Sequence, residues 1–100
     1  DFIHVDDVVS AISLSIENHE AFDNQVFNLC TGVETSSDQL IQKISSALNK
    51  KLEIEQIRGY VGDQFHSSGL NTKLVKTGWS PKKSIDDGID EFLQYVKRIK

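Results

Sequence analysis

Two capping boxes define where two helices of this chain should begin. Ser36 is followed three residues later by Gln39, and Ser84 is followed by Asp87 at the same spacing. In each pair the two side chains can satisfy the free backbone N–H groups of a helix start reciprocally. Apolar residues recur at helical spacing after both boxes. After the second box they are Ile85, Ile89, Phe92, Leu93 and Val96.

Short segments rich in β-branched residues alternate with helical stretches. The three predicted strands are residues 3–5, 26–29 and 52–57. Asp6 and Asp7 follow the first of them and suit the cap and first turn of a further helix, where carboxylates accept N–H bonds and face the positive end of the helix dipole. A short helix is expected over residues 73–77, with Gly78 as its stop signal.

The expected fold class is therefore α/β, a small β-α-β-α-β-α-α unit with about three short strands and four helices. Strand and helix alternation favours parallel strands, which usually need both faces covered. Three strands are few for an independent sheet. A chain of 100 residues also buries only about 60 to 65% of the surface that its unfolded form exposes. We expect one domain, residues 1–100, whose stability depends partly on contacts outside it.

Composition narrows the class of protein. With 38% hydrophobic and 26% charged residues, the chain matches globular proteins rather than disordered or membrane-spanning ones. The formal net charge of -4 indicates no basic surface for nucleic acid. Cys30 is the only cysteine, which excludes an internal disulfide and, with no signal peptide in sight, favours a cytoplasmic protein. The sequence has no Met and begins with Asp1, so we expect a piece of a longer chain.

Two groups of side chains suggest chemistry that the residues do not require. His4, Asp6 and Asp7 offer one nitrogen and two oxygens, but ligands crowded at one helix start cannot easily surround a metal ion. Cys30 with His4 or His66 could supply a thiol nucleophile, although no third, orienting group is indicated. We therefore expect no metal site, no catalytic residue, and a buried structural thiol.

A loop rich in glycine and serine is the candidate binding segment. Arg58, Tyr60 and Asp63 lie there beside Gly59 and Gly62, and rigid scaffolds often carry binding residues in such loops. On the residues alone, a polar surface turn explains the same pattern more simply.

Trp79 is expected to pack rather than to bind. Its ring could stack on a base, but we interpret it as an anchor between the last two helices. Lys82 and Lys83 are interpreted as solvated charge.

Four motifs carry a resemblance to a known enzyme family. They are Asp1-Phe2-Ile3-His4-Val5-Asp6-Asp7, Phe27-Asn28-Leu29-Cys30-Thr31-Gly32, Gly62-Asp63 and Thr77-Gly78-Trp79-Ser80-Pro81. In this order the chain resembles the C-terminal part of the extended short-chain dehydrogenase/reductase family, the NAD-dependent nucleotide-sugar epimerases and dehydratases. The resemblance covers essentially the whole chain and implies the C-terminal lobe of an extended Rossmann-type enzyme.

The resemblance implies that the cofactor and catalytic parts lie elsewhere. The family's dinucleotide-binding domain and its catalytic Tyr-x-x-x-Lys would precede Asp1. Neither Tyr60 nor Tyr95 has lysine four residues later, and Gly59 and Gly62 lack the next glycine of a phosphate loop. We therefore expect NAD to be bound by the missing domain, with no cofactor held by this chain alone.

The resemblance assigns substrate binding to this lobe. Phe2 takes the aromatic place beside a substrate-binding arginine that would lie just before the chain. Tyr60 stands where the family usually has a second arginine for the diphosphate, so Arg58, Tyr60 or a different grip could serve. Asp63 matches an acid of the same loop that commonly contacts substrate. Cys30 stands where many members have glycine, so it is either strained at positive φ or fills a core gap.

The implied function is to position a nucleoside diphosphate sugar for hydride transfer to NAD in the full-length enzyme. The reaction type stays open between isomerase, lyase and oxidoreductase. The expected partners are the nucleotide-sugar and the remainder of the chain, with self-association through uncovered surface, and neither nucleic acid nor membrane. The alternative is a free-standing small protein-interaction module that binds through the glycine-rich loop or an exposed sheet edge.

Overall fold

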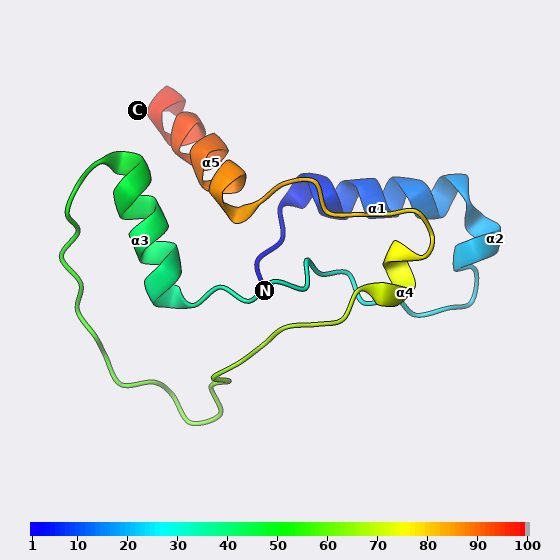
Figure 1. Ribbon diagram of the computed structural model, residues 1–100, viewed down its shortest axis with the longest axis horizontal. Coiled ribbons are helices and arrows are strands. Elements are labelled where there is room, and N and C mark those ends of the chain that lie inside the picture. Colours follow the sequence, from blue (N-terminus) through cyan, green and yellow to red (C-terminus); the bar gives the residue numbers. More distant parts are fainter. Residues whose placement is uncertain (100) are drawn as a thin grey trace.

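The computed structural model describes residues 1–99, and its regular structure there is helical throughout (Figure 1). There are three long helices, α1, α3 and α5, and two single-turn helices, α2 and α4. Their bounds are Val5–Glu17 for α1, His19–Phe22 for α2, Ser37–Leu48 for α3, Thr72–Val75 for α4 and Ile85–Ile99 for α5.

Both capping boxes are confirmed. The Ser36 hydroxyl accepts from the Gln39 N–H at 3.1 Å, and the Gln39 side chain accepts from the Ser36 N–H at 2.9 Å. Ser84 and Asp87 make the same reciprocal pair at 3.1 and 3.3 Å. Because each box satisfies two N–H groups that have no partner inside the helix, α3 and α5 begin where the sequence indicates.

The predicted α/β class, with its three strands, is wrong. No residue between 1 and 99 is in a strand, and Val5 already belongs to α1. A strand exists only where a neighbouring strand takes up its N–H and C=O groups. Within the described chain, residues 52–57 make no backbone hydrogen bond to another segment, so their β-branched composition has nothing to pair with.

The main core lies around α1, α2 and α4. Ala11, Leu74 and Trp79 are buried there, and five partly buried side chains pack around them. These are Ile3, Leu14, Phe22, Phe27 and Leu29. The packing role expected for Trp79 is confirmed, but its neighbours are α1 and α4 rather than α5.

Asp7 joins α1 to the segment that leads into α5. Its carboxylate is 3% exposed and accepts from the backbone N–H groups of Lys82 and Lys83 at 2.9 and 3.1 Å. The indole N–H of Trp79 donates to the Asp7 carbonyl at 3.1 Å and to the Ser10 hydroxyl at 3.0 Å. Asp7 is thus a tertiary anchor rather than the helix cap that its position suggested.

A second pair of helices, α3 and α5, packs at the other side of the N-terminal segment (Figure 1). Ile89 is its buried residue, and Lys43 bonds Asp86 across the pair at 2.9 Å. Phe92 remains 62% exposed, so the apolar stripe of α5 is covered only in part.

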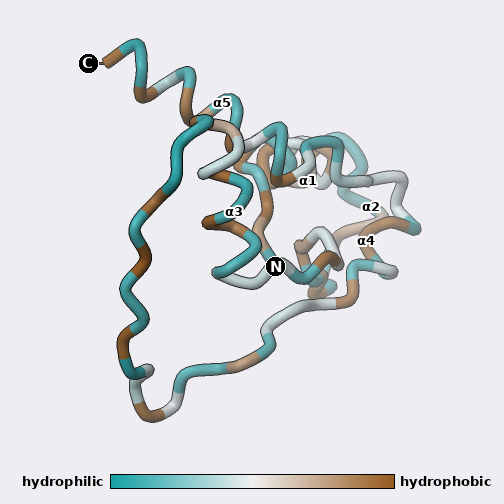
Figure 2. Tube along the Cα trace, turned by 60° about the vertical axis from the view of Figure 1, so that its left-hand side comes forward, coloured by the Kyte–Doolittle hydropathy of each residue, from teal (hydrophilic) through white to brown (hydrophobic). Residues whose placement is uncertain are grey.

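Residues 50–70, called the arm below, swing away from the helices in a wide arc (Figure 1). Every residue from 53 to 68 is exposed, and hydrophobic stretches alternate with polar ones along the arc (Figure 2). The arm gives the molecule extents of 50 × 38 × 19 Å and a radius of gyration of 16.7 Å, against about 13 Å for a compact domain of this length.

Candidate functional site

The candidate binding loop contains an ordered turn at the far part of the arm. The N–H of Asp63 donates to the carbonyl of Tyr60 at 3.1 Å, which closes a four-residue turn. Gly62 is the third residue of this turn and has a φ of 95°, the region that a type II turn requires there and that glycine enters without strain.

The Asp63 carboxylate also holds this turn together. Its Oδ2 accepts from the Tyr60 N–H at 2.7 Å. A Cβ at Gly59 would lie 3.2 Å from the same oxygen, so the glycine leaves room for the carboxylate. Two of the predicted site residues, Tyr60 and Asp63, are therefore brought together by the Tyr60 backbone and the Asp63 carboxylate, whereas the Tyr60 side chain takes no part.

Arg58 and Tyr60 present their side chains to solvent. Tyr60 is 80% exposed, and Arg58 is exposed as well. Within residues 1–99, Arg58 forms no ion pair. A guanidinium in this state is free to bind a phosphate with two parallel N–H bonds.

Phe2, the fourth predicted site residue, lies apart from the loop. It is 50% exposed and belongs to an apolar groove of about 450 Å³ between the N-terminal segment, α3 and α5. The groove is lined by Phe2, Ile3, Leu40, Ile44, Ile89 and Phe92 among others. The structure therefore does not join Phe2 to Arg58, Tyr60 and Asp63 in one cavity.

The returning end of the arm meets the N-terminal segment at a polar cleft of about 320 Å³. The His66 imidazole lies 3.5 Å from the Glu34 carboxylate across this cleft. The Asp1 carboxylate accepts from the N–H groups of Thr31 and Gly32 at 3.0 and 2.8 Å. Nothing in the spacing of Glu34 and His66 along the sequence indicates their contact.

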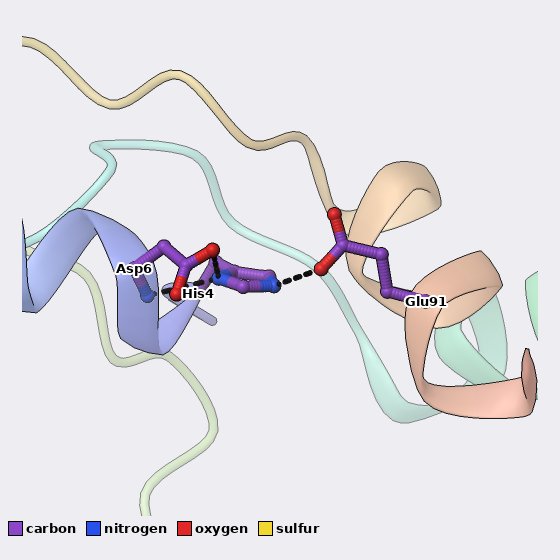
Figure 3. Close-up of side chains that lie close together, drawn as sticks. All are labelled: His4, Asp6 and Glu91. Carbon is purple, nitrogen blue, oxygen red and sulfur yellow. Dashed lines mark hydrogen bonds and ion pairs between the residues drawn. The ribbon is translucent and has the colours of Figure 1, made fainter. Parts of the chain in front are cut away.

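A second polar cluster, which we call the His4 cluster, consists of His4, Asp6, Lys83 and Glu91. His4 caps α1, because its Nδ1 accepts from the Asp6 N–H at 2.9 Å. Its Nε2 lies 2.8 Å from Oε2 of Glu91 on α5. Figure 3 shows the His4 ring between the start of α1 and Glu91. The Lys83 ammonium bonds the other oxygen of Glu91.

The hydrogen bonds within this cluster favour the charged forms of Glu91 and Lys83. The hydrogen bond from Lys83, and a second one from His4, hold the pKa of Glu91 below its usual 4.5. The same Lys83–Glu91 bond raises the pKa of Lys83 above its usual 10.5. Lys83 was interpreted from the sequence as solvated charge; its side chain is 36% exposed and also forms an ion pair with Glu91. Its partner lies on another element, eight residues along the chain, so only the fold reveals the pair.

The His4 cluster has the donor types of a metal site but not the free donors. One ligand atom from each of His4, Asp6 and Glu91 falls within 4.8 Å of the others. Both nitrogens of His4 are engaged in hydrogen bonds, and Lys83 already neutralises Glu91. A divalent cation would have to displace an ammonium and a helix cap, so the arrangement does not favour one.

Cys30 and the glycines offer no further chemistry. His4 contacts Glu91 and His66 contacts Glu34, so both histidines pair with carboxylates. Cys30 packs closely on Gly69, where an added Cβ would lie 2.9 Å from the Cys30 sulfur. The positive φ of this region, 79°, falls on Gly32, so Cys30 fills a gap without strain.

The residues present do not fit a dinucleotide cradle. A phosphate loop places its glycines immediately before a helix N-terminus. Gly62 instead lies in the arm turn, and the next helix begins only at Thr72. In addition, none of the helices described between residues 1 and 99 is long and apolar enough to span a bilayer.

Comparison with known proteins confirms the resemblance. The chain is 30% identical to the dTDP-4-dehydro-6-deoxyglucose reductase of Escherichia coli, over 97% of this chain and 30% of that enzyme. It is 33% identical to the UDP-glucose 4-epimerase of Mycolicibacterium smegmatis, over 97% of this chain and 31% of that enzyme. The GDP-6-deoxy-D-mannose reductase of Pseudomonas aeruginosa is 31% identical over 93% of this chain. No family model and no solved structure matches.

These relatives are nucleotide-sugar epimerases and reductases of the extended short-chain dehydrogenase/reductase family, and the chain matches a portion of each. It spans about 30% of the length of the curated relatives.

Proposed function

We propose that this chain is the C-terminal, substrate-binding part of an NAD-dependent epimerase, dehydratase or reductase that acts on a nucleotide-sugar. The observation that carries the proposal is the match over 97% of the chain to two enzymes of this kind. Because the match covers nearly every residue, the arm and its turn fall inside it.

The arm supplies the residues that would grip the ligand. The guanidinium of Arg58 is exposed and unpaired within residues 1–99, as a group that binds a diphosphate needs to be. The Tyr60 hydroxyl offers a neutral hydrogen bond beside it. Asp63 has a positioning role, because its Oδ2 fixes the turn, while its Oδ1 is left for a sugar hydroxyl.

Phe2 is proposed to contact the substrate from the other side. Its ring is half exposed at the edge of the apolar groove, where it could cover one face of the nucleotide. For this to happen the arm has to fold toward the N-terminal segment when ligand binds. Such closure would bring binding energy to bear on orientation of the sugar.

The cofactor belongs to another part of the enzyme in this proposal. NAD, bound there, would accept and return a hydride, and the residues of this chain would hold the nucleoside diphosphate so that the sugar faces it. We place the enzyme in the cytoplasm. Cys30 is the only cysteine of the chain, and an unpaired thiol is consistent with a compartment that keeps thiols reduced.

The alternative of a free-standing interaction module is not favoured. Only four apolar residues are buried between residues 1 and 99, namely Ala11, Leu74, Trp79 and Ile89. Large apolar side chains such as Val61 and Phe65 are fully exposed to solvent. The surface left open suits a lobe that folds against the remainder of its own enzyme.

Calorimetric titration of the intact enzyme with UDP-, dTDP- and GDP-sugars tests the proposal. We expect Arg58→Ala to weaken binding of the preferred nucleotide-sugar by roughly tenfold to a hundredfold, the range of a charge-assisted hydrogen bond. Lys51→Ala is the matched control, because Lys51 is an exposed cation on the same arm but outside the turn. An intact enzyme that binds none of these ligands would overturn the proposal, and equal affinity of wild type and Arg58→Ala would remove Arg58 from the site.

A further inference from the structure

We propose that His4 is a proton-sensitive joint between α1 and α5. In its neutral form the ring caps α1 and also holds α5. In its protonated form it holds α5 more strongly and releases the cap.

The two contacts of the ring determine which nitrogen carries the proton. Nδ1 lies 2.9 Å from the backbone nitrogen of Asp6, whose N–H can only donate, so Nδ1 has to accept. Nε2 lies 2.8 Å from the Glu91 carboxylate, which only accepts when ionised, so Nε2 has to donate. The neutral imidazole with its proton on Nε2 is the one form that makes both bonds.

The acidic and basic neighbours of His4 on α5 and on the segment before it keep their charge near neutral pH. The pKa of Glu91 is lowered by its bonds with Lys83 and His4, and the pKa of Lys83 is raised by the same ion pair. Tyr95 and Arg98 of α5 line the cleft beside the ring. Histidine is the side chain that ordinarily changes charge between about pH 5 and 8.

The groups nearest to Nδ1 decide what protonation does. The Asp6 carboxylate lies 3.8 Å from Nδ1. This distance is too long for a hydrogen bond, but a small movement of the carboxylate would allow one to form. On α5, Gly88 faces the ring without a side chain, and a Cβ there would lie 3.4 Å from Cδ2. A side chain at this position would press on the ring, so Gly88 leaves the ring its place beside α5.

Protonation converts Nδ1 from an acceptor into a donor. Two donors then face each other at the Asp6 N–H, and the cap bond is lost. The imidazolium gains an ion pair with Glu91 and draws the Asp6 carboxylate closer. The first turn of α1 loosens as a result, although the His4 carbonyl still accepts from the Asp7 N–H at 3.0 Å.

The first turn of α1 is connected to α5 through Asp7, so a change in this turn can reach α5. Asp7 follows directly and binds the backbone of Lys82 and Lys83, the residues that lead into α5. A change at the start of α1 therefore reaches both the ion pair of Lys83 and the orientation of α5.

Nuclear magnetic resonance of the intact protein, with histidine and aspartate labelled with nitrogen-15, tests the inference. At about pH 8 we expect the His4 nitrogen shifts of an Nε2–H tautomer. Between about pH 8 and about pH 5.5 we expect protection of the Asp6 amide from hydrogen exchange, corrected for intrinsic rates, to fall roughly fivefold, which is the size of an ordinary helix cap. The fall should follow the titration of the His4 ring itself.

Two variants separate His4 from the other histidines. Asparagine is a good cap that does not titrate, so His4→Asn should keep the Asp6 amide protected at both pH values. His66→Asn should retain the wild-type response, because His66 is exposed and pairs with Glu34. An Nδ1–H tautomer at alkaline pH, constant Asp6 protection while His4 titrates, or a pH response that survives in His4→Asn would each overturn the inference.

Discussion

The core around α1 and the arm both contain large apolar residues, but the two regions differ in how far those residues are buried. Trp79 is 4% exposed, with its indole N–H bonded to α1, whereas Phe65 on the arm is 100% exposed. In the core, Trp79 and the Asp7 carboxylate bond residues that are distant in sequence. In the arm, the turn closed by Asp63 is a local contact, and contacts with distant residues are made at the returning end, where His66 lies 3.5 Å from Glu34.

This difference indicates how the two regions serve the proposed function. The core holds the N-terminal segment and α5 in a fixed relation, because the Asp7 carboxylate ties α1 to residues 82–83. The arm keeps binding groups in solvent on a long extended segment. A rigid base with an exposed arm is the arrangement from which a ligand can be enclosed with little rearrangement of the base.

Removal of the Trp79 side chain should produce the largest difference between the regions. We expect Trp79→Ala to lower the free energy of unfolding of the chain by about 3 to 5 kcal/mol, because it leaves a cavity in the core and removes the indole N–H that bonds the Asp7 carbonyl and the Ser10 hydroxyl. Phe65→Ala should change it by less than about 0.5 kcal/mol. Urea titrations followed by circular dichroism measure both, and comparable losses for the two variants would show that the arm is not the exposed region described.

Removal of the Asp7 carboxylate should give the second largest loss in the free energy of unfolding. Asp7→Ala leaves the N–H groups of Lys82 and Lys83 without their acceptor, and we expect a loss of about 2 to 3 kcal/mol in the free energy of unfolding. Asp6→Ala is the neighbouring control, with an exposed carboxylate and an expected loss below about 1 kcal/mol. Thermal unfolding of the three proteins gives the comparison. A smaller loss for Asp7→Ala than for Asp6→Ala would contradict the anchoring role.

The turn in the arm tests whether local geometry matters for binding rather than for stability. Gly62 has a φ of 95° and open space where a Cβ would be, so Gly62→Ala introduces backbone strain of about 1 to 2 kcal/mol and no clash. We expect a roughly fivefold to thirtyfold weaker affinity for nucleotide-sugar in the intact enzyme, with an unchanged melting temperature of the core. An affinity equal to that of the wild type would separate the turn from the site.

The ion pair of Lys83 and Glu91 should give the smallest effect. Because Lys83 is the main cause of the lowered pKa of Glu91, Lys83→Ala should move that pKa upward toward 4.5, with the bond from His4 still holding it partly down. A group with a lowered folded-state pKa adds stability above its unfolded pKa and loses it as the pH falls through the folded value. Carbon-13 shifts of the Glu91 carboxyl follow the titration, and an unmoved midpoint would show that the pair does not form.

Local signals in the sequence were reliable where a few adjacent residues decide the outcome. The boxes Ser36–Gln39 and Ser84–Asp87 predicted the starts of α3 and α5, because a cap is complete within one turn of chain. Gly78 likewise follows the short helix α4 with a φ of 103°. The turn around Gly62 lies where the glycine-rich loop was expected.

Contacts between distant residues were the part that sequence could not provide. Residues 52–57 have strand composition but no partner strand within the described chain, so the predicted sheet is absent. Asp7 was expected to cap α1, whereas His4 does so and Asp7 binds residues 82–83. The pairing of His4 with Glu91 spans 87 positions, and no spacing rule connects them. The substrate-binding assignment of Phe2, Arg58, Tyr60 and Asp63 stays a prediction.

The most direct test of the substrate-gripping role is hydrogen exchange of the intact enzyme, measured by mass spectrometry with and without saturating nucleotide-sugar. We expect the amides of residues 58–63 to become protected at least about tenfold when the ligand is bound, while the amides of α2, His19–Phe22, at the opposite end of α1, exchange as before. Unchanged exchange at residues 58–63 in an enzyme that demonstrably binds the ligand would contradict the account.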